Sequence, residues 1–599
     1  MFRKLCLSAA TAGMLWAAPS LCVAQEAATK PVLSVAVSGV QELIDDLDYL
    51  GDLAGQPGSG QQLEAMSVFF TQGHGLEGVD RKRPWGAAVN ATEDGQFQVL
   101  IFIPVAKMEK LMATVAVFTG EPEDAGDGVW ELAADRQSVF AKENDGWAYF
   151  AQSKEALENL PADPIKLLGG LSERYDIAAQ VHVQSLPEPM REMFIDQLRA
   201  GMEGSMEQEE GESDEQYKLR TSMAEHQLEA MSQMANELDE ITLGWNVDRP
   251  AKQVYLDVAT TALPGSKAAE QLNALKTNVK ASRFAGFLAP EAIFSLHGNS
   301  VLSEQDRART EETVAAMRQQ AMAALENDED LGDDEKGLAK QFIEDVLELA
   351  KAQLESGSFS GGMTVQGEGP INIVAGSAVP DGALVEEKLK KWITLASQEE
   401  KFPKVKYNVG EHEGVKFHVA SLPIPAEAND REKIVALLGD KVDFTVGIGK
   451  DSAFFAIGPQ GMDMIKQVID DSKKVGGTDA KEPVSASLAV GKLLSVLAKV
   501  DEEHGETFGE VAASIQKAGS DHFRIESKLI ENGGQYRFLA EEGVIQAMAA
   551  VGKAQQQRQQ LEGDDEELEG DDADDDSDDD DDDDADADDD DDDDEESDT

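Results

Sequence analysis

One unit recurs four times along this chain, and its order of elements constrains the fold more than any other feature of the sequence. The unit is a strand, two helices, a hairpin of two strands and a closing helix. The strands repeat apolar residues at every second position, and the helices repeat them at every third or fourth. Four strands open the copies: Val32–Val37, Ile177–Val183, Ala292–Leu296 and Val484–Val490.

The first copy shows how each element is predicted. Ser38 and Gln41 have the spacing of a capping box, which predicts the start of a helix directly after the first strand. After a second helix, the runs Trp85–Asn90 and Phe97–Ile103 around the turn residues Glu93-Asp94-Gly95 predict a hairpin.

A strand-rich insert follows the first copy and again follows the third. Each insert closes with an aromatic strand that leads into a helix, Trp147–Ala151 in one case and Ala453–Ile457 in the other. The matched order predicts two related halves, 32–278 and 290–556. Because hairpins pair antiparallel, we expect an α+β fold of duplicated strand-helix-helix-hairpin-helix units, with antiparallel sheets covered on one face by helices.

The first 24 residues have the composition of a signal peptide. Arg3 and Lys4 precede an apolar stretch over Leu5–Ala18, and the small residues of Cys22-Val23-Ala24 predict cleavage after Ala24. The apolar stretch is shorter than a bilayer span, and no later stretch is long enough for one. We therefore expect a secreted or periplasmic protein with no transmembrane segment in the mature chain.

The chain has two cysteines, and both lie within the predicted signal peptide. After cleavage, Cys6 and Cys22 are lost, so disulfides, thiol nucleophiles and thiolate metal sites are excluded. The remaining chain is long enough to bury sizeable apolar cores without such cross-links.

Acidic residues dominate the charge. Residues 562–599 contain 29 Asp and Glu residues and no basic residue, which predicts a disordered tail. The tail accounts for less than half of the net charge of −65, so the rest is acidic as well. This charge argues against binding to nucleic acid or anionic headgroups. The tail itself could bind calcium weakly, attract cationic partners or only maintain solubility.

Motifs of common enzymes are absent from the sequence. It contains neither the His-Glu-x-x-His of zinc hydrolases nor the Gly-x-Ser-x-Gly of serine hydrolases. Gly447–Asp451 resembles a phosphate loop, but Asp451 replaces the required Ser or Thr, so a hairpin turn is favoured. His412 and His418 are interpreted as strand residues beside a turn, and we predict no metal site and no catalytic residue.

One basic segment interrupts the acidic sequence. Arg81, Lys82 and Arg83 lie just before a predicted strand, next to Trp85. These four residues are the candidate binding site, for an anionic ligand or an acidic segment such as the chain's own tail. The alternative is a loop that only offsets local acidic charge.

Three stretches resemble those of an uncharacterised family of secreted proteins typical of planctomycete-type bacteria. They are Gly78–Gly86, Asp145–Lys154 and Ile241–Trp245. The resemblance implies export and a bacterial source, but no activity and no functional residue.

These observations favour a non-enzymatic binding or scaffold protein of the bacterial envelope, whose partner is an unknown protein or a cationic surface. One alternative is a hydrolase with paired carboxylates, which requires two inward carboxylates about 5–10 Å apart in a cleft. The other is a carrier that holds an apolar ligand in a groove between sheet and helices.

Overall fold

The computed structural model describes residues 30–553, apart from 93–94, 135–136, 204–207, 209–216, 218–219, 222–223, 225–227, 229–231, 233–234, 328–331, 398–401, 429, 476–481, 502–503 and 517–518. Residues up to Ala549 form one compact unit, and Ala550 begins a second unit. The predicted signal peptide and acidic tail lie outside the described residues.

The elements of the first half follow the predicted order. Its strands are β1 (Leu33–Val37), β2 (Trp85–Ala91), β3 (Phe97–Pro104), β4 (Glu123–Asp124), β5 (Val129–Ala134), β6 (Gln137–Asn144), β7 (Trp147–Ala151), β8 (Ile177–His182), β9 (Leu238–Asp248) and β10 (Gln253–Ala262). Its α-helices are α2 (Val40–Leu53), α3 (Ser59–Phe70), α4 (Met108–Thr119), α5 (Glu188–Glu203) and α7 (Lys267–Asn278). Short 3-10 helices are η2 (Glu155–Leu157), η3 (Pro164–Leu168), η4 (Leu171–Glu173), η5 (Val183–Ser185) and η7 (Ala285–Phe287).

The second half has the same sequence of strands. They are β11 (Phe294–Val301), β12 (Ser358–Gln366), β13 (Asn372–Ala378), β14 (Lys406–His412), β15 (Val415–Pro423), β16 (Lys441–Ile448), β17 (Ser452–Ile457), β18 (Val484–Ala489), β19 (His522–Ile530) and β20 (Gly533–Glu541). Its helices are α8 (Glu304–Asn327), α9 (Asp333–Ser356), α10 (Gly382–Ala396), α11 (Arg431–Leu438), α12 (Gly461–Val475), α13 (Val490–Leu497) and α14 (Gly505–Gln516). A further helix begins at residue 542.

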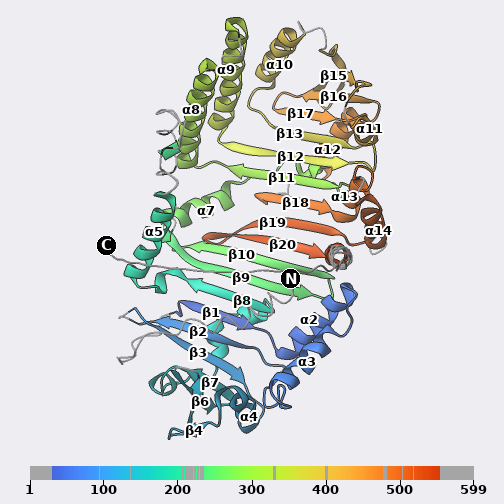
Figure 1. Cartoon of the computed structure of the whole chain (residues 1–599). Helices are drawn as coiled ribbons and strands as arrows, with labels where there is room; N and C mark the ends of the chain where they lie inside the picture. Colours follow the sequence, from blue (N-terminus) through green and yellow to red (C-terminus); the bar gives the residue numbers. More distant parts are fainter. Residues whose placement is uncertain are drawn as a thin grey trace, which may run out of the picture. The chain divides into compact units, whose positions relative to one another are not determined.

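All described strands belong to one 20-stranded sheet, and every pair in it is antiparallel. The pairings give the order β4-β5-β6-β7-β3-β2-β1-β8-β9-β10-β20-β19-β18-β11-β12-β13-β17-β16-β15-β14. Figure 1 shows α2 and α3 beside one end of the strands and α8 and α9 beside the other. The predicted α+β fold is therefore confirmed.

The two halves have the same strand order when each is followed from its outer edge inward. A strand of the second half has the same neighbours as the strand of the first half whose number is ten lower. For example, β1 pairs with β8 and β11 pairs with β18, and β3 pairs with β7 and β13 pairs with β17. We expected a separate sheet in each half, but β10 pairs with β20 along Gln253–Thr261 and Gly533–Glu541. This ladder joins the halves because it satisfies the backbone groups that two separate sheets would leave exposed at their edges.

The predicted capping box at Ser38 is wrong. Gly39 is the N-cap residue of α2, and no side chain caps this helix. A Cβ atom at Gly39 would lie 2.8 Å from the carbonyl oxygens of Arg81 and Lys82. This close approach of two backbones requires glycine at the position where the helix begins.

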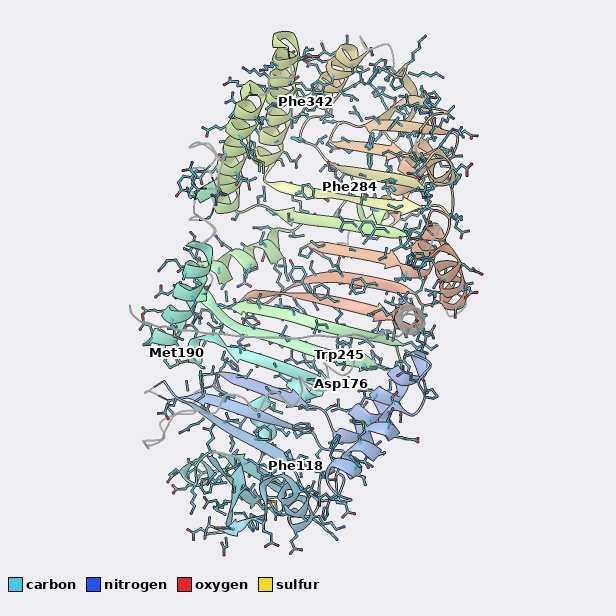
Figure 2. The ribbon with its side chains drawn as sticks, viewed as in Figure 1. Phe118, Asp176, Met190, Trp245, Phe284 and Phe342 are labelled. Atoms are coloured by element: carbon cyan, nitrogen blue, oxygen red, sulfur yellow. The ribbon has the colours of Figure 1, made fainter. Side chains whose placement is uncertain are left out.

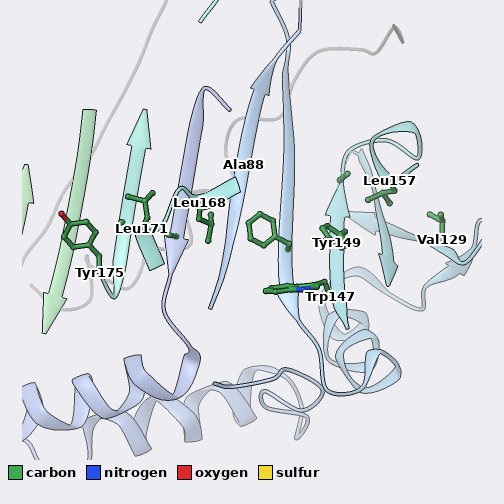
Figure 3. Close-up of a cluster of buried hydrophobic side chains, with 12 residues drawn as sticks. Ala88, Val129, Trp147, Tyr149, Leu157, Leu168, Leu171 and Tyr175 are labelled. Atoms are coloured by element: carbon green, nitrogen blue, oxygen red, sulfur yellow. The ribbon is translucent and has the colours of Figure 1, made fainter. Parts of the chain in front are cut away.

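One face of the sheet, here called the covered face, carries the main apolar cores. In the first half, Leu157, Leu168 and Leu171 lie on η2, η3 and η4 and pack against Phe102 and Tyr149 of the sheet (Figure 3). In the second half, η7 and α12 provide the corresponding cover. Their buried side chains Phe284, Phe287, Ile465 and Val468 pack on Val374, Phe417, Phe454 and Ala456.

Between these two cores, the covered face is polar. Asp257 of β10 is 1% exposed and accepts two hydrogen bonds from Arg537 of β20, at 2.7 and 2.8 Å. Tyr175 and Gln535 donate to the same carboxylate. Burial and the nearby Asp257 raise the pKa of Tyr175 to about 12, so its hydroxyl stays protonated and can donate. This network lies at the middle of the ladder that joins the halves.

Candidate functional site

The opposite face of the sheet, here called the open face, carries a continuous row of apolar side chains. Each residue of this apolar row is directly paired with the next on the neighbouring strand, so all of them project from the same face. The row crosses thirteen strands: Trp85, Val37, Ile177, Trp245, Leu256, Phe538, Ile525, Ala486, Leu296, Met363, Ala375, Phe455 and Val446. No member is charged, although the chain has a net charge of −65.

A second apolar row runs beside the first, two residues further along each strand. Its members are Val247, Val254, Ala540, Phe523, Leu488, Phe294, Val365, Ile373, Ile457, Phe444 and Ala420. Phe444 of this row contacts Phe455 of the apolar row, with ring centroids 6.3 Å apart. The open face is thus a band of adjacent apolar rows.

Large members of the apolar row are exposed. The exposed fractions are 46% for Ile177, 39% for Trp245, 37% for Leu256 and 43% for Phe455. Figure 2 shows Trp245 on its strand in the middle of the sheet. Soluble proteins rarely leave a contiguous apolar surface of this kind uncovered unless it binds something.

Two of the described helices, α4 and α10, pack on the outer strands of the open face. At one end, Met108, Leu111 and Met112 of α4 pack on Ala141 and Ala148 of β6 and β7. At the other end, α10 lies near β15, where Glu386 is 3.7 Å from the buried His418. The exposed members of the apolar row lie on strands between these two covered ends.

The arrangement reverses the usual pattern of an antiparallel sheet, in which the apolar face is covered and the polar face is solvated. On β10 and β20, the covered face carries Asp257 and Arg537, whereas the open face carries Leu256 and Phe538. The central strands therefore keep their charged residues on the side of the cores and present their apolar residues to solvent.

The structure separates the four residues of the predicted basic site. Arg81 forms an ion pair with Glu64 of α3, and Arg83 lies over the ring of Trp147, 4.1 Å from its centroid. Lys82 is exposed. Trp85 belongs to the apolar row, and its Nε1 is buried without a hydrogen-bond partner among the described residues. No single anion-binding pocket brings these four together; Trp85 instead connects the segment to the open face.

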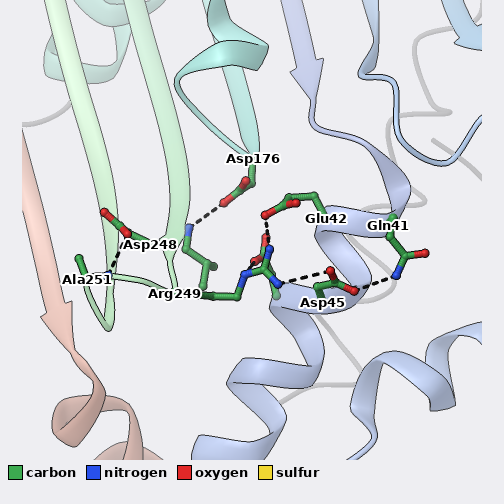
Figure 4. Close-up of polar contacts among 9 residues, drawn as sticks. Gln41, Glu42, Asp45, Asp176, Asp248, Arg249 and Ala251 are labelled. Carbon is green, nitrogen blue, oxygen red and sulfur yellow. Dashed lines mark hydrogen bonds and ion pairs between the residues drawn. The ribbon is translucent and has the colours of Figure 1, made fainter.

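A cluster of carboxylates lies between the start of α2 and the start of β8 (Figure 4). Glu42, Asp46 and Asp176 offer oxygen atoms that all lie within 4.8 Å of one another. Asp176 accepts a hydrogen bond of 2.7 Å from the backbone N–H of Val247. Arg249 pairs with Glu42, and its Nε lies 3.2 Å from Asp46.

Burial and the neighbouring Asp176 raise the pKa of Asp46 to about 7. The pKa of Asp176 is also raised by burial, although the Val247 N–H opposes the shift. Two buried carboxyl groups this close favour a shared proton, and Arg249 supplies a positive charge in the same space. Carboxylate oxygens of this kind could hold a hard cation, but the guanidinium of Arg249 already provides the positive charge beside them.

This cluster does not fit the predicted carboxylate hydrolase. The oxygens are closer than the roughly 5–10 Å separation of glycosidase pairs. Asp46 is only 4% exposed and Asp176 is buried as well, so a substrate would have little access to either carboxylate. The cluster is better described as a contact between α2 and the β9–β10 turn.

The remaining candidate motifs are explained by the fold. Gly447–Asp451 spans the turn between β16 and β17, as predicted. His412 pairs with Asp470 at 2.8 Å, whereas the Nδ1 of His418 accepts a hydrogen bond from the backbone N–H of Asn408. The two histidines therefore have separate partners.

The open face was missed because no single segment encodes it. Each strand contributes one or two apolar side chains, and strands as distant as β8 and β16 share one row. The available signal is the alternation of apolar and other residues within some single strands, as in Leu243–Trp245 and Leu256–Val258. Alternation predicts an apolar side but not whether another element covers it.

Among the described residues, no helix is both long and apolar enough to cross a membrane. No family model matches the chain, and no curated protein or solved structure shows significant similarity to it.

Proposed function

We propose that this chain is a secreted or periplasmic, non-enzymatic binding protein of the bacterial envelope that holds apolar molecules on its open face. The observation that carries the proposal is the uncharged apolar row, which crosses thirteen strands and has exposed members along its length. Because the exposed members are less than half exposed, covering one of them contributes roughly 1 kcal/mol, so a ligand must cover several of them to bind.

The contacts of the sheet indicate what kind of molecule fits. The backbone groups of the central strands are already paired on both sides, so the open face offers side-chain contacts and few hydrogen bonds. A polar ligand would lose hydrogen bonds to water without replacement. The open face therefore favours an apolar small molecule, as in the predicted carrier, over a hydrolase substrate.

Binding of the uncharged, apolar dye Nile red tests this proposal. We expect dye fluorescence to rise on binding, and we expect Leu256→Glu to weaken binding about tenfold because a carboxylate would then lie in the middle of the apolar row. The measurement is a fluorescence titration at constant ionic strength.

Lys528→Ala is the matched control. Lys528 is exposed on β19 and projects from the covered face, and its loss changes the net charge by the same amount as Leu256→Glu. We expect the control to bind the dye like the native chain. A native chain that does not bind Nile red, or equal loss in both variants, would contradict the proposal.

A further inference from the structure

We propose that the open face binds the acyl chains of phospholipids whose headgroup carries no net charge. The inference rests on the proposed function and adds the chemical class of the ligand. Three properties of the open face lead to it: its length, the pairing of its backbone hydrogen-bonding groups and the charge that surrounds it.

The length of the apolar row exceeds that of a single acyl chain. Thirteen strands at a spacing of about 4.8 Å give a row of roughly 58 Å. One leaflet of a bilayer core is roughly 15 Å thick, which corresponds to about three strand spacings. The row therefore has room for several acyl chains side by side.

Because the backbone groups of the sheet are already paired, the open face is expected to bind an acyl chain better than a peptide. An extended peptide laid on the open face would bury backbone N–H and C=O groups against side chains such as Leu256 and Phe538, which cannot bond to them. An acyl chain has no polar group to satisfy. The face of the sheet, unlike a free edge, thus favours hydrocarbon over polypeptide.

The negative charge of the chain determines which headgroup an acyl-chain ligand can carry. The chain has 117 acidic and 52 basic residues, so it repels anionic headgroups. The same repulsion opposes a second copy of this chain as the partner on the open face. A zwitterionic phospholipid combines the required acyl chains with a headgroup of no net charge.

Trp245 provides a direct reporter, because it is an exposed member of the apolar row. The test mixes the exported chain with phosphatidylcholine vesicles whose acyl chains carry bromine, a short-range quencher of tryptophan fluorescence. We expect quenching with brominated lipid and none with unbrominated lipid. The double variant Trp85→Phe/Trp245→Phe, which removes both tryptophans of the apolar row, should lose most of the quenching, and the Lys528→Ala control should keep it.

A parallel series replaces half of the phosphatidylcholine by brominated anionic phosphatidylglycerol. We expect weaker binding to these vesicles by about tenfold at low ionic strength. Equal or tighter binding to the anionic vesicles would overturn the headgroup assignment.

The outcomes distinguish the two proposals. If Nile red binds but brominated phosphatidylcholine does not quench, the acyl-chain inference is wrong and the proposed function stands. If neither ligand binds, the proposed function itself is wrong. Quenching that survives in the double variant Trp85→Phe/Trp245→Phe, which lacks both tryptophans of the apolar row, would place the lipid away from this row and would also overturn the inference.

Discussion

The burial and the pKa of Asp46 are set by residues that are distant from it in the sequence. Asp46 and Asp45 are neighbours on the same amphipathic helix, and the sequence pattern predicts no difference between their surroundings. In the structure, Asp46 is buried beside Asp176 and Arg249, whereas Asp45 lies at the surface of the helix and accepts a hydrogen bond from Gln41. The difference arises because Asp176 reaches α2 from a strand more than a hundred residues away.

The pKa of Asp46 leads to a prediction about stability and pH. Because the folded pKa of about 7 is above the ordinary value of 3.8, the folded state binds more protons than the unfolded state between these values. This contribution to stability is fully present below pH 4 and is lost as the pH rises through 7. We expect Asp46→Asn, which mimics the protonated form, to stabilise the protein by about 1–3 kcal/mol at pH 8 and to change little at pH 4.

Urea denaturation at both pH values checks this prediction. Asp52→Asn is the control, because Asp52 is an exposed residue of the same helix. A difference between native and Asp46→Asn that does not vary with pH would contradict the proton-sharing interpretation.

At the scale of elements, α9 and α10 contact each other, although no pattern in the sequence predicts this contact. Asp345 of α9 accepts hydrogen bonds of 2.7 Å from Lys388 and Lys391, and one of 3.0 Å from Trp392. Phe342 packs on the ring of Trp392 at 4.9 Å. Burial alone would raise the pKa of Asp345, but these hydrogen bonds outweigh burial and lower it to about 2.

We expect Asp345→Ala to detach α10 from α9 without unfolding the sheet. Two lysines and an indole N–H would lose their shared acceptor, whereas α10 would keep its contacts with β16 and β17. Hydrogen exchange should therefore accelerate at least several-fold in α10 and the end of α9 and stay unchanged in β10 and β20.

Glu344→Ala is a suitable comparison for this experiment. Glu344 precedes Asp345 but pairs with Arg318 of α8 instead. Unchanged exchange in α10 of Asp345→Ala, or the same acceleration in Glu344→Ala, would contradict the role of Asp345.

At the scale of the whole molecule, the ladder between β10 and β20 decides whether the halves form one sheet. Asp257 and Arg537 are directly paired at the centre of this ladder, and the rest of their network comes from Tyr175 and Gln535. The same strand order on both sides of the ladder is the pattern that a duplication would leave. Duplication itself stays a prediction.

We expect Asp257→Asn to destabilise the protein by about 2–3 kcal/mol. The substitution leaves Arg537 and the Tyr175 hydroxyl without their ionised acceptor in a buried position, and breaking a buried pair costs more than breaking a surface pair. Equilibrium unfolding in urea measures the change.

Glu526→Gln provides the comparison on the same face. Glu526 is exposed and lies opposite Arg537 in the β19–β20 register. We expect this variant to differ from the native chain by less than about 0.5 kcal/mol. Equal effects of the two substitutions would show that the buried network does not stabilise the joint between the halves.

Local patterns in the sequence determined the elements. The predicted strands Trp85–Asn90 and Ala453–Ile457 appear as β2 and β17, because short apolar or aromatic runs beside turn residues favour strands. The capping box at Ser38 failed because a contact with residues 81 and 82, which are distant in sequence, decides the start of α2.

The open face, which is the candidate site, could be predicted from the sequence only in part. The sequence determined that Leu256 and Phe538 lie on the apolar sides of their strands, since side-chain direction follows from position along the strand. Only the tertiary structure brought those sides into one row and left Leu256 and Trp245 exposed, because strand neighbours and covering helices are set by contacts between residues far apart in the chain.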